Sequence, residues 1–176
     1  INQFTGDGVM ALFGAPVAHE DHAQRACHAA LSIQQAILYY GEKIKEAIGI
    51  DFIMRIGINS GPVVVGSIGD DLRMDYTAAG DTTNLASRME NKAAPGSILI
   101  SGPTHRLVRD YFEFHSMGKV EVKGKEKPQE AFRLIKATEI STRLEAAMTK
   151  GLTRFVGRRN SMASLMEAYE IIKSGL

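Results

Sequence analysis

Hydrophobic and polar positions along the chain follow two periods, which predict two kinds of element. Alternating or β-branched apolar runs bounded by glycine, proline or polar residues are typical of strands. Such runs occur at 1–13, 52–59, 63–68, 75–77, 97–101, 112–123 and 131–135. Strands separated by helical segments, several of them in hairpins, indicate an α/β sandwich with a mainly antiparallel sheet flanked by helices.

Helices are predicted where apolar residues recur every three or four positions. This spacing occurs from about His22 to about Tyr40, over 81–90, from Pro103 onward, and over 161–173. In the first of these segments the expected buried face consists of Ala23, Ala26, Cys27, Ala30, Ile33, Ile37 and Leu38. The polar segment from Gly41 to Gly49 is expected to lie outside the helix.

The segment 75–90 combines a short strand, a turn at Gly80 and a helix that Asp81 or Thr82 would open. Both residues suit the start of a helix, because their side-chain oxygens can accept hydrogen bonds from the free amides of the first turn. We therefore expect this helix to be rigidly placed at the end of a strand.

The spacing of residues along this helix predicts one buried face and one polar face. Leu85 and Met89 stand four residues apart and suit burial, while Asn84 and Arg88 stand four apart about a quarter-turn away. The planar guanidinium of Arg88 suits a phosphate. Spacing alone leaves open an ordinary surface helix whose polar face carries Asn and Arg.

A second candidate lies in the turn Gly6-Asp7-Gly8, between two runs that read as paired strands. A turn aspartate is often present only for its backbone preference. A single carboxylate on a turn is also chemically sufficient as half of a Mg²⁺ site, because this ion takes oxygen ligands and often only one or two carboxylates.

The amino-acid sequences of three segments resemble one protein family. Tyr76-Thr77 with Gly80 to Met89 resembles the signature of class III nucleotidyl cyclases, the adenylyl and guanylyl cyclase catalytic domain. Residues 4–14 are similar to the cyclase hairpin that carries the second of two metal-binding aspartates, and residues 55–61 with Val65-Gly66 are similar to the cyclase strand pair. The resemblance covers residues 1 to about 136 and implies a ferredoxin-like core.

The resemblance implies a set of site residues. Asn84 and Arg88 match the catalytic pair that steadies the ribose and the α-phosphate during ring closure. Asp7 matches a ligand of two Mg²⁺ (or Mn²⁺) ions per site, Lys123 matches the lysine that neutralises the terminal phosphates, and Arg73 is a further candidate phosphate contact. In the family the metal aspartates and the Asn/Arg pair come from opposite subunits, so a homodimer is implied.

The choice of base rests on Gln3 and Thr77. They occupy the positions where the family reads adenine with a lysine and with an Asp or Thr, and Thr77 fits the threonine-bearing branch. Gln3 departs from that lysine and from the glutamate of guanylyl cyclases, and its carboxamide can donate to adenine or accept from guanine. We predict ATP as the substrate. GTP, or a catalytically silent cyclase-like dimerisation domain, remains the alternative.

Composition adds limits rather than a function. The net charge of +1 gives no case for broad attraction to nucleic acid or membranes, and no apolar run approaches the ~20 residues that cross a bilayer. Cys27 is the single cysteine, which excludes an intrachain disulfide and fits a reducing cytoplasm. His19, His22 and His28 lie at a helix start and on a polar face, so we do not interpret them as a metal cluster.

We expect three segments. Residues 1–136 form the cyclase-like domain without its first strand, residues 137–150 form a linker, and residues 151–176 resemble the segment with which AAA-type ATPase modules begin. The chain starts within a strand pattern at Ile1, so we expect a fragment whose first metal aspartate lies upstream. Such a fragment is expected to be inactive by itself.

Overall fold

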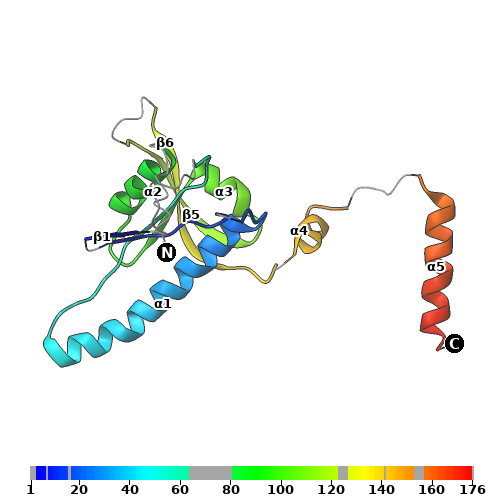
Figure 1. Ribbon diagram of the computed structural model, residues 1–176, viewed down its shortest axis with the longest axis horizontal. Coiled ribbons are helices and arrows are strands. Elements are labelled where there is room, and N and C mark those ends of the chain that lie inside the picture. Colours follow the sequence, from blue (N-terminus) through cyan, green and yellow to red (C-terminus); the bar gives the residue numbers. More distant parts are fainter. Residues whose placement is uncertain are drawn as a thin grey trace, which may run out of the picture. The chain divides into compact units, whose positions relative to one another are not determined.

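A computed structural model describes residues 3–6, 8–15, 17–63, 81–122, 127–140, 142–152 and 157–175, without the side chains of residues 3–5 (Figure 1). The elements in chain order are β1 (Gln3–Thr5), β2 (Gly8–Met10), α1 (His22–Ile48), β3 (Ile56–Ile58), α2 (Asp81–Lys92), β4 (Ile98–Ser101), α3 (Gly102–Val108), β5 (Phe112–Val120), β6 (Gln129–Ala137), α4 (Arg143–Thr149) and α5 (Arg159–Lys173). They fall into two compact units, Ile1–Ser141 and Thr142–Leu176.

The first unit is built on a four-stranded sheet with the order β3-β4-β6-β5. Strand β3 runs parallel to β4, with Gly57 opposite Leu99, and the two other pairings are antiparallel. The α/β architecture with a mainly antiparallel sheet is therefore as predicted.

Helices cover both faces of this sheet. Residue Leu99 of β4 packs into a core with Leu85 and Met89 of α2. Because neighbouring residues of a strand point to opposite faces, Ile98 and Ile100 face the other side. On that side α3 and β6 meet where the rings of His105 and Phe132 stack with centroids 3.8 Å apart, and α1 meets β5 through His28 and Phe112.

A separate hairpin joins β1 to β2, as the turn chemistry predicts. The antiparallel register pairs Gln3 with Met10 and Thr5 with Gly8, and Gly6 adopts a positive φ of 67°. A glycine accepts this left-handed conformation without the steric cost that a Cβ atom brings. Asp7, in the same hairpin, lies outside the described residues.

Helix α1 is longer than predicted. It continues through Gly41 to Ile48 and ends at Gly49, whose φ of 72° and hydrogen bond to the carbonyl of Lys45 are typical of a helix C-cap. Gly41 does not interrupt the helix. Its lack of a side chain leaves room for the returning chain, since a Cβ atom there would lie 3.1 Å from the carbonyl oxygen of Phe52.

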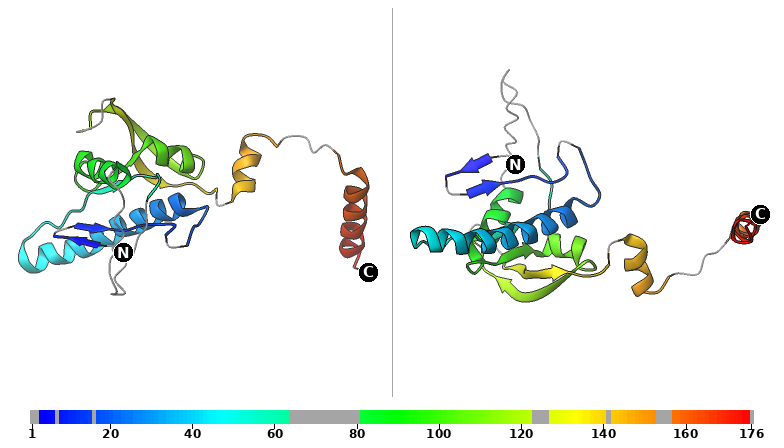
Figure 2. Two further views of the ribbon diagram at one scale, coloured as in Figure 1. Left: turned by 45° about the horizontal axis from the view of Figure 1, so that its top comes forward. Right: turned by 90° about the horizontal axis from the view of Figure 1, so that it is seen from below.

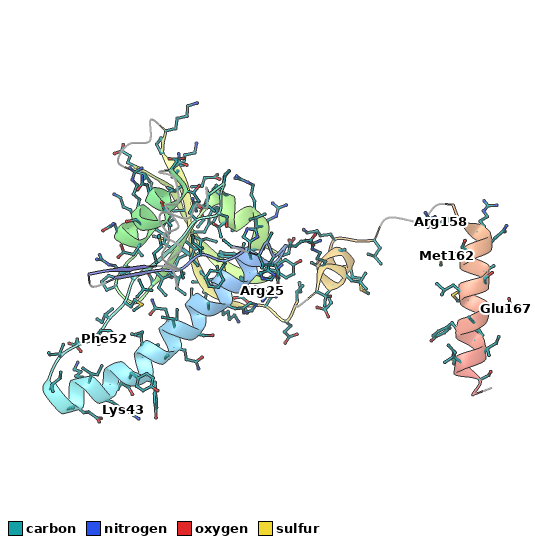
Figure 3. All side chains as sticks on the ribbon, in the orientation of Figure 1. Arg25, Lys43, Phe52, Arg158, Met162 and Glu167 are labelled. Atoms are coloured by element: carbon teal, nitrogen blue, oxygen red, sulfur yellow. The ribbon has the colours of Figure 1, made fainter. Side chains whose placement is uncertain are left out.

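The predicted buried face of α1 holds only as far as Ala30. Ala23, Cys27 and Ala30 are buried, whereas Ile33 is 44% exposed and Leu38 is 70% exposed. The second half of the helix extends beyond the sheet (Figures 1 and 2), which leaves these side chains without a covering layer within the described part of the chain. Figure 3 shows Lys43 and Phe52 at this far end of the helix, away from the dense side chains around the sheet.

Other strand predictions are shortened or untested. The run 52–59 contains a strand only at β3, and the predicted strands at 63–68 and 75–77 fall largely or wholly in 64–80, outside the described residues.

In the second unit, α4 begins with a capping box in which Thr142 and Glu145 exchange hydrogen bonds of 3.1 and 3.0 Å. None of the described helices combines the length and the apolarity needed to cross a bilayer.

Candidate functional site

Helix α2 presents the predicted Asn/Arg pair about a quarter-turn from its buried face. Leu85 and Met89 are 5% and 0% exposed, while Asn84 is exposed and Arg88 is partly exposed. At roughly 100° per residue, Asn84 and Arg88 lie within about 40° of each other around the helix axis. The predicted division of this helix into a buried face and a polar face is therefore confirmed.

Both side chains of the pair are at least partly exposed within the described part of the chain. Within the part of the chain that the structure describes, neither the carboxamide of Asn84 nor the guanidinium of Arg88 makes a hydrogen bond or an ion pair. A carboxamide beside a planar cationic fork can hold hydroxyl groups and a phosphate at once. This arrangement suits a nucleotide.

Alternate residues of β3 and its flanks hold α2 in place. The strand and the helix run in opposite directions, so successive strand contacts fall on earlier helix residues. Arg55 Nε lies 3.4 Å from Glu90 Oε1, and Gly57 lies under Ala86. Asn59 Nδ2 donates to Thr82 O at 2.9 Å. Two strand residues span about 6.6 Å. Four helix residues span about 6.0 Å. Every second residue of the strand can therefore contact every fourth residue of the helix.

The N-terminal turn of α2 is fastened to the loop after β3. Thr82 Oγ1 donates to the carbonyl oxygen of Pro62 at 2.7 Å. The hydroxyl of Thr82 thus donates its proton to a long-range contact, and the capping role predicted for Thr82 stays a prediction. The helix begins at Asp81, the other predicted opening residue.

A chain of polar contacts continues from Asn59 to the start of α3. Ser101 Oγ donates to Asn59 Oδ1 at 2.6 Å and lies 3.2 Å from Thr104 Oγ1, and Thr104 Oγ1 donates to Ser60 Oγ at 3.1 Å. Ser101 and Thr104 are fully buried. Among the described residues every buried side-chain nitrogen and oxygen has a hydrogen-bond partner.

The structure places two of the seven predicted site residues. Asp7, Arg73, Thr77 and Lys123 lie outside the described residues, and Gln3 is described only by its backbone in β1. Their roles stay predictions. Within the described ranges no group of three or more His, Cys, Asp or Glu side chains is placed to hold a metal ion.

Histidines that drew attention in the sequence have structural contacts. His22 Nδ1 lies 2.8 Å from the carbonyl oxygen of His19, and the His28 ring packs 4.7 Å from that of Phe112. His105 stacks on Phe132, and this burial, assisted by the positive charge of Arg109, lowers its pKa below the ordinary value of 6.5.

Sequence reasoning missed the residues that position α2. Gly57, Asn59 and Ser101 carry no chemistry that their own spacing makes conspicuous. The available signal was the period-two pattern Arg55-Ile56-Gly57-Ile58-Asn59, in which polar or small residues alternate with isoleucine and therefore share one face of a strand.

The comparisons with known proteins agree with this geometry. Residues 3–136 match the family model described as the adenylate and guanylate cyclase catalytic domain. Adenylate cyclase 1 of Rhizobium meliloti is 36% identical over 137 residues, which are 77% of this chain and 21% of that protein. The chain thus spans about a fifth of the length of this curated relative.

Two solved structures are similar in both sequence and fold. The adenylyl cyclase CyaB from P. aeruginosa superposes with a TM-score of 0.71 at 31% identity, covering 78% of this chain and 72% of that one. The guanylate cyclase domain of RhGC from Catenaria anguillulae, in complex with GTP, gives a TM-score of 0.61 at 36% identity, with coverages of 72% and 66%.

Proposed function

Because the chain belongs to the adenylate and guanylate cyclase catalytic domain family, we propose that it converts ATP to 3′,5′-cyclic AMP and pyrophosphate at a homodimer interface. The observation that carries this proposal is that Asn84 and Arg88 share one side of α2, a helix fixed by its buried face, and that neither side chain is paired among the described residues. In this reaction the ribose 3′-hydroxyl attacks the α-phosphorus, a new ester bond forms, and pyrophosphate leaves.

Arg88 would meet the charge that develops on the α-phosphate. Its guanidinium is a planar donor that pairs with phosphate oxygens in two places. Removal of one positioned donor of this kind typically lowers kcat by about 100- to 1,000-fold. Asn84 would hold the ribose so that its 3′-hydroxyl stays in line with the bond that breaks.

The carboxylate of Asp7 fits a hard divalent cation, which prefers oxygen ligands. Two Mg²⁺ or Mn²⁺ ions, when bound, supply activation of the hydroxyl group and neutralisation of the leaving group. Lys123 and Arg73 would hold the terminal phosphates as point charges and donors. Gln3 and Thr77 would contact the base.

The composite site is part of the proposal. We place Asp7 from one protomer and Asn84 with Arg88 from its twin around one nucleotide, so an isolated protomer is expected to be inactive. Mixing Asp7→Ala protein with Arg88→Ala protein tests this. Because each mixed dimer would hold one intact site of two and half of the dimers would be mixed, activity is expected to return to about a quarter of wild type.

Guanylyl cyclase activity is the second candidate, favoured by Gln3 in place of the adenine-reading lysine and by the similarity to a guanylate cyclase domain in complex with GTP. The deciding experiment measures cyclic AMP and cyclic GMP formation by the full-length protein with Mg²⁺ or Mn²⁺. A kcat/KM at least tenfold higher for ATP is expected, and a preference for GTP contradicts the choice of substrate.

The assay needs variants that separate an active site from a silent domain. Arg88→Ala and Asn84→Ala are expected to lower turnover by about 100-fold or more without a change in thermal stability, because both side chains are partly or fully exposed. Lys92→Ala is the matched control, since it removes a positive charge from the same helix one turn further on. If wild type forms neither product, or if all three variants behave alike, the chain is a binding or dimerisation domain instead.

A further inference from the structure

We propose that Asn59 is a positioning residue for the cyclase reaction: through Ser101 it fixes the N-terminal turn of α2, and with it the place of Asn84 and Arg88. This inference rests on the proposed function, because it concerns the geometry of that same site. Asn59 itself is outside the Asn/Arg pair and acts on it only through the helix.

The carboxamide of Asn59 joins two elements that approach it from opposite sides. Its Oδ1 accepts from Ser101 Oγ at 2.6 Å, and its Nδ2 donates to Thr82 O at 2.9 Å. An amide carries one acceptor oxygen and a two-proton donor nitrogen, so both ends are used at once. Because the Thr82 carbonyl oxygen can only accept, the amide nitrogen faces α2, and the amide oxygen is left to accept from the Ser101 hydroxyl.

Ser101 suits this role because its neighbours enclose it on all sides. It is fully buried at the end of β4, where it also begins α3, and its Oγ accepts from the backbone N–H of Thr104 at 3.5 Å. Because β4 ends and α3 begins at Ser101, the packing of both elements fixes its position. Its bond to Asn59 therefore restrains α2 relative to the sheet.

The contact at Thr82 sets the position of the helix segment that carries Asn84 and Arg88. Thr82 lies two residues before Asn84 and six before Arg88, which at 1.5 Å per residue is about 9 Å along the helix axis to the arginine. A helix moves as a unit over this length. Any slide or rotation of the first turn therefore shifts both side chains together.

The other contacts of α2 restrict different motions. Gly57 sets how closely the helix approaches the sheet, and the apolar contacts of Leu85 and Met89 are not directional. The ion pair of Arg55 and Glu90 is long, at 3.4 Å, and both partners are substantially exposed, so it contributes little. Two directional bonds at Thr82 resist sliding along the strand: the one from Asn59 Nδ2 to the Thr82 carbonyl oxygen, and the one from Thr82 Oγ1 to the carbonyl oxygen of Pro62. Of the two, only the bond of Asn59 connects α2 to the buried Ser101.

The test compares Asn59→Ala and Ser101→Ala with Val108→Ala in the full-length protein. Val108 is fully buried in α3, and its apolar side chain makes no hydrogen bond to Asn59 or Ser101. Its truncation is therefore expected to lower stability without displacing α2. Asn59→Ala is expected to lower kcat by about 10- to 100-fold with KM changed less than about threefold, because misplacement of about 1 Å costs on this scale. Val108→Ala at a temperature well below its Tm is expected to keep the wild-type kcat.

Two further readouts separate this inference from the proposed function. Amide hydrogen exchange in residues 84–89 is expected to become faster in Asn59→Ala while exchange in β6 stays as in wild type, and this does not depend on any activity. The double variant Asn59→Ala with Ser101→Ala is expected to lose no more kcat than Asn59→Ala alone, because both act through one chain. Unchanged exchange in α2, or a kcat loss matched by Val108→Ala, overturns the inference; an inactive wild type with faster exchange in the variant overturns only the proposed function.

Discussion

Gly57 lies directly beneath Ala86, so closely that a Cβ atom at position 57 would overlap the carbonyl oxygen of Ala86 and the backbone nitrogen of Glu90. The Cα of Glu90 would also lie only 2.8 Å away. These are backbone atoms of a helix, which cannot turn aside as a flexible side chain can. The absence of a side chain at one strand position therefore sets the distance between the sheet and the helix that carries Asn84 and Arg88.

Gly57→Ala is accordingly expected to destabilise the protein by about 1–3 kcal/mol, the usual cost of overpacking a core. The measurement is urea unfolding, with the free energy of unfolding taken from the midpoint and slope. Gly41→Ala is the comparison variant, and a smaller loss of stability is expected for it. Its added Cβ would lie 3.1 Å from the Phe52 carbonyl oxygen, a tight contact but no overlap, and alanine favours the helix. Wild-type stability in Gly57→Ala would show that α2 can move away from the sheet without cost.

Met89→Ala is expected to cost about 2–5 kcal/mol, because the side chain is fully buried in the core that joins α2 to β4 and its loss leaves a cavity. Met117→Ala provides the control, since that methionine is 49% exposed on β5 and its truncation is expected to change the free energy of unfolding by less than about 0.5 kcal/mol. Equal effects of the two variants would contradict the assignment of α2 to the core.

Cys27 is expected to resist alkylation in the folded protein. Burial raises the pKa of its thiol from 9.0 to about 12, so the reactive thiolate is nearly absent at pH 8. Iodoacetamide should label no thiol in the native state and one per chain in denaturant, because the sequence has a single cysteine. Rapid labelling of the native protein would show that α1 opens at this position.

The same thiol predicts a dependence of stability on alkaline pH. Its folded-state pKa lies above the unfolded value, so its contribution to stability is complete below pH 9 and is lost as the pH rises toward about 12. The free energy of unfolding of wild type is therefore expected to fall between pH 9 and 11 more steeply than that of Cys27→Ala. Parallel curves for the two proteins would contradict the burial of the thiol.

His105 is expected to destabilise the fold in acid. Burial against Phe132 and the charges of Arg109 and Arg106 lower its pKa, against the opposing influence of Glu130. Its folded-state pKa thus lies below the unfolded value of 6.5, so the unfolded chain binds the proton first and stability is lost as the pH falls below 6.5. His105→Leu should lack this part of the acid dependence in urea unfolding measured from pH 7 to pH 5, and an equal slope in both proteins would argue against it.

Much of the fold follows from local patterns. The hairpin at Gly6, the two faces of α2 and the mainly antiparallel sheet were predicted, because turn chemistry and period-two or period-3.6 spacing act over a few residues. The end of α1 was predicted wrongly, since Gly41 serves a contact with Phe52 rather than a break. The roles of Asp7, Arg73, Thr77, Lys123 and Gln3, the metal ions, the domain boundaries and the AAA-like nature of residues 151–176 stay predictions.

The sequence by itself determined that Asn84 and Arg88 emerge together from a helix whose buried face lies about a quarter-turn away, because the geometry of an α-helix converts a spacing of four into one direction. Only the tertiary structure decided what holds that helix. The bonds from Asn59 to Thr82 and from Ser101 to Asn59 join residues 23 and 42 positions apart. Such contacts depend on the register between a strand and a helix, and that register arises only when the whole sheet has formed.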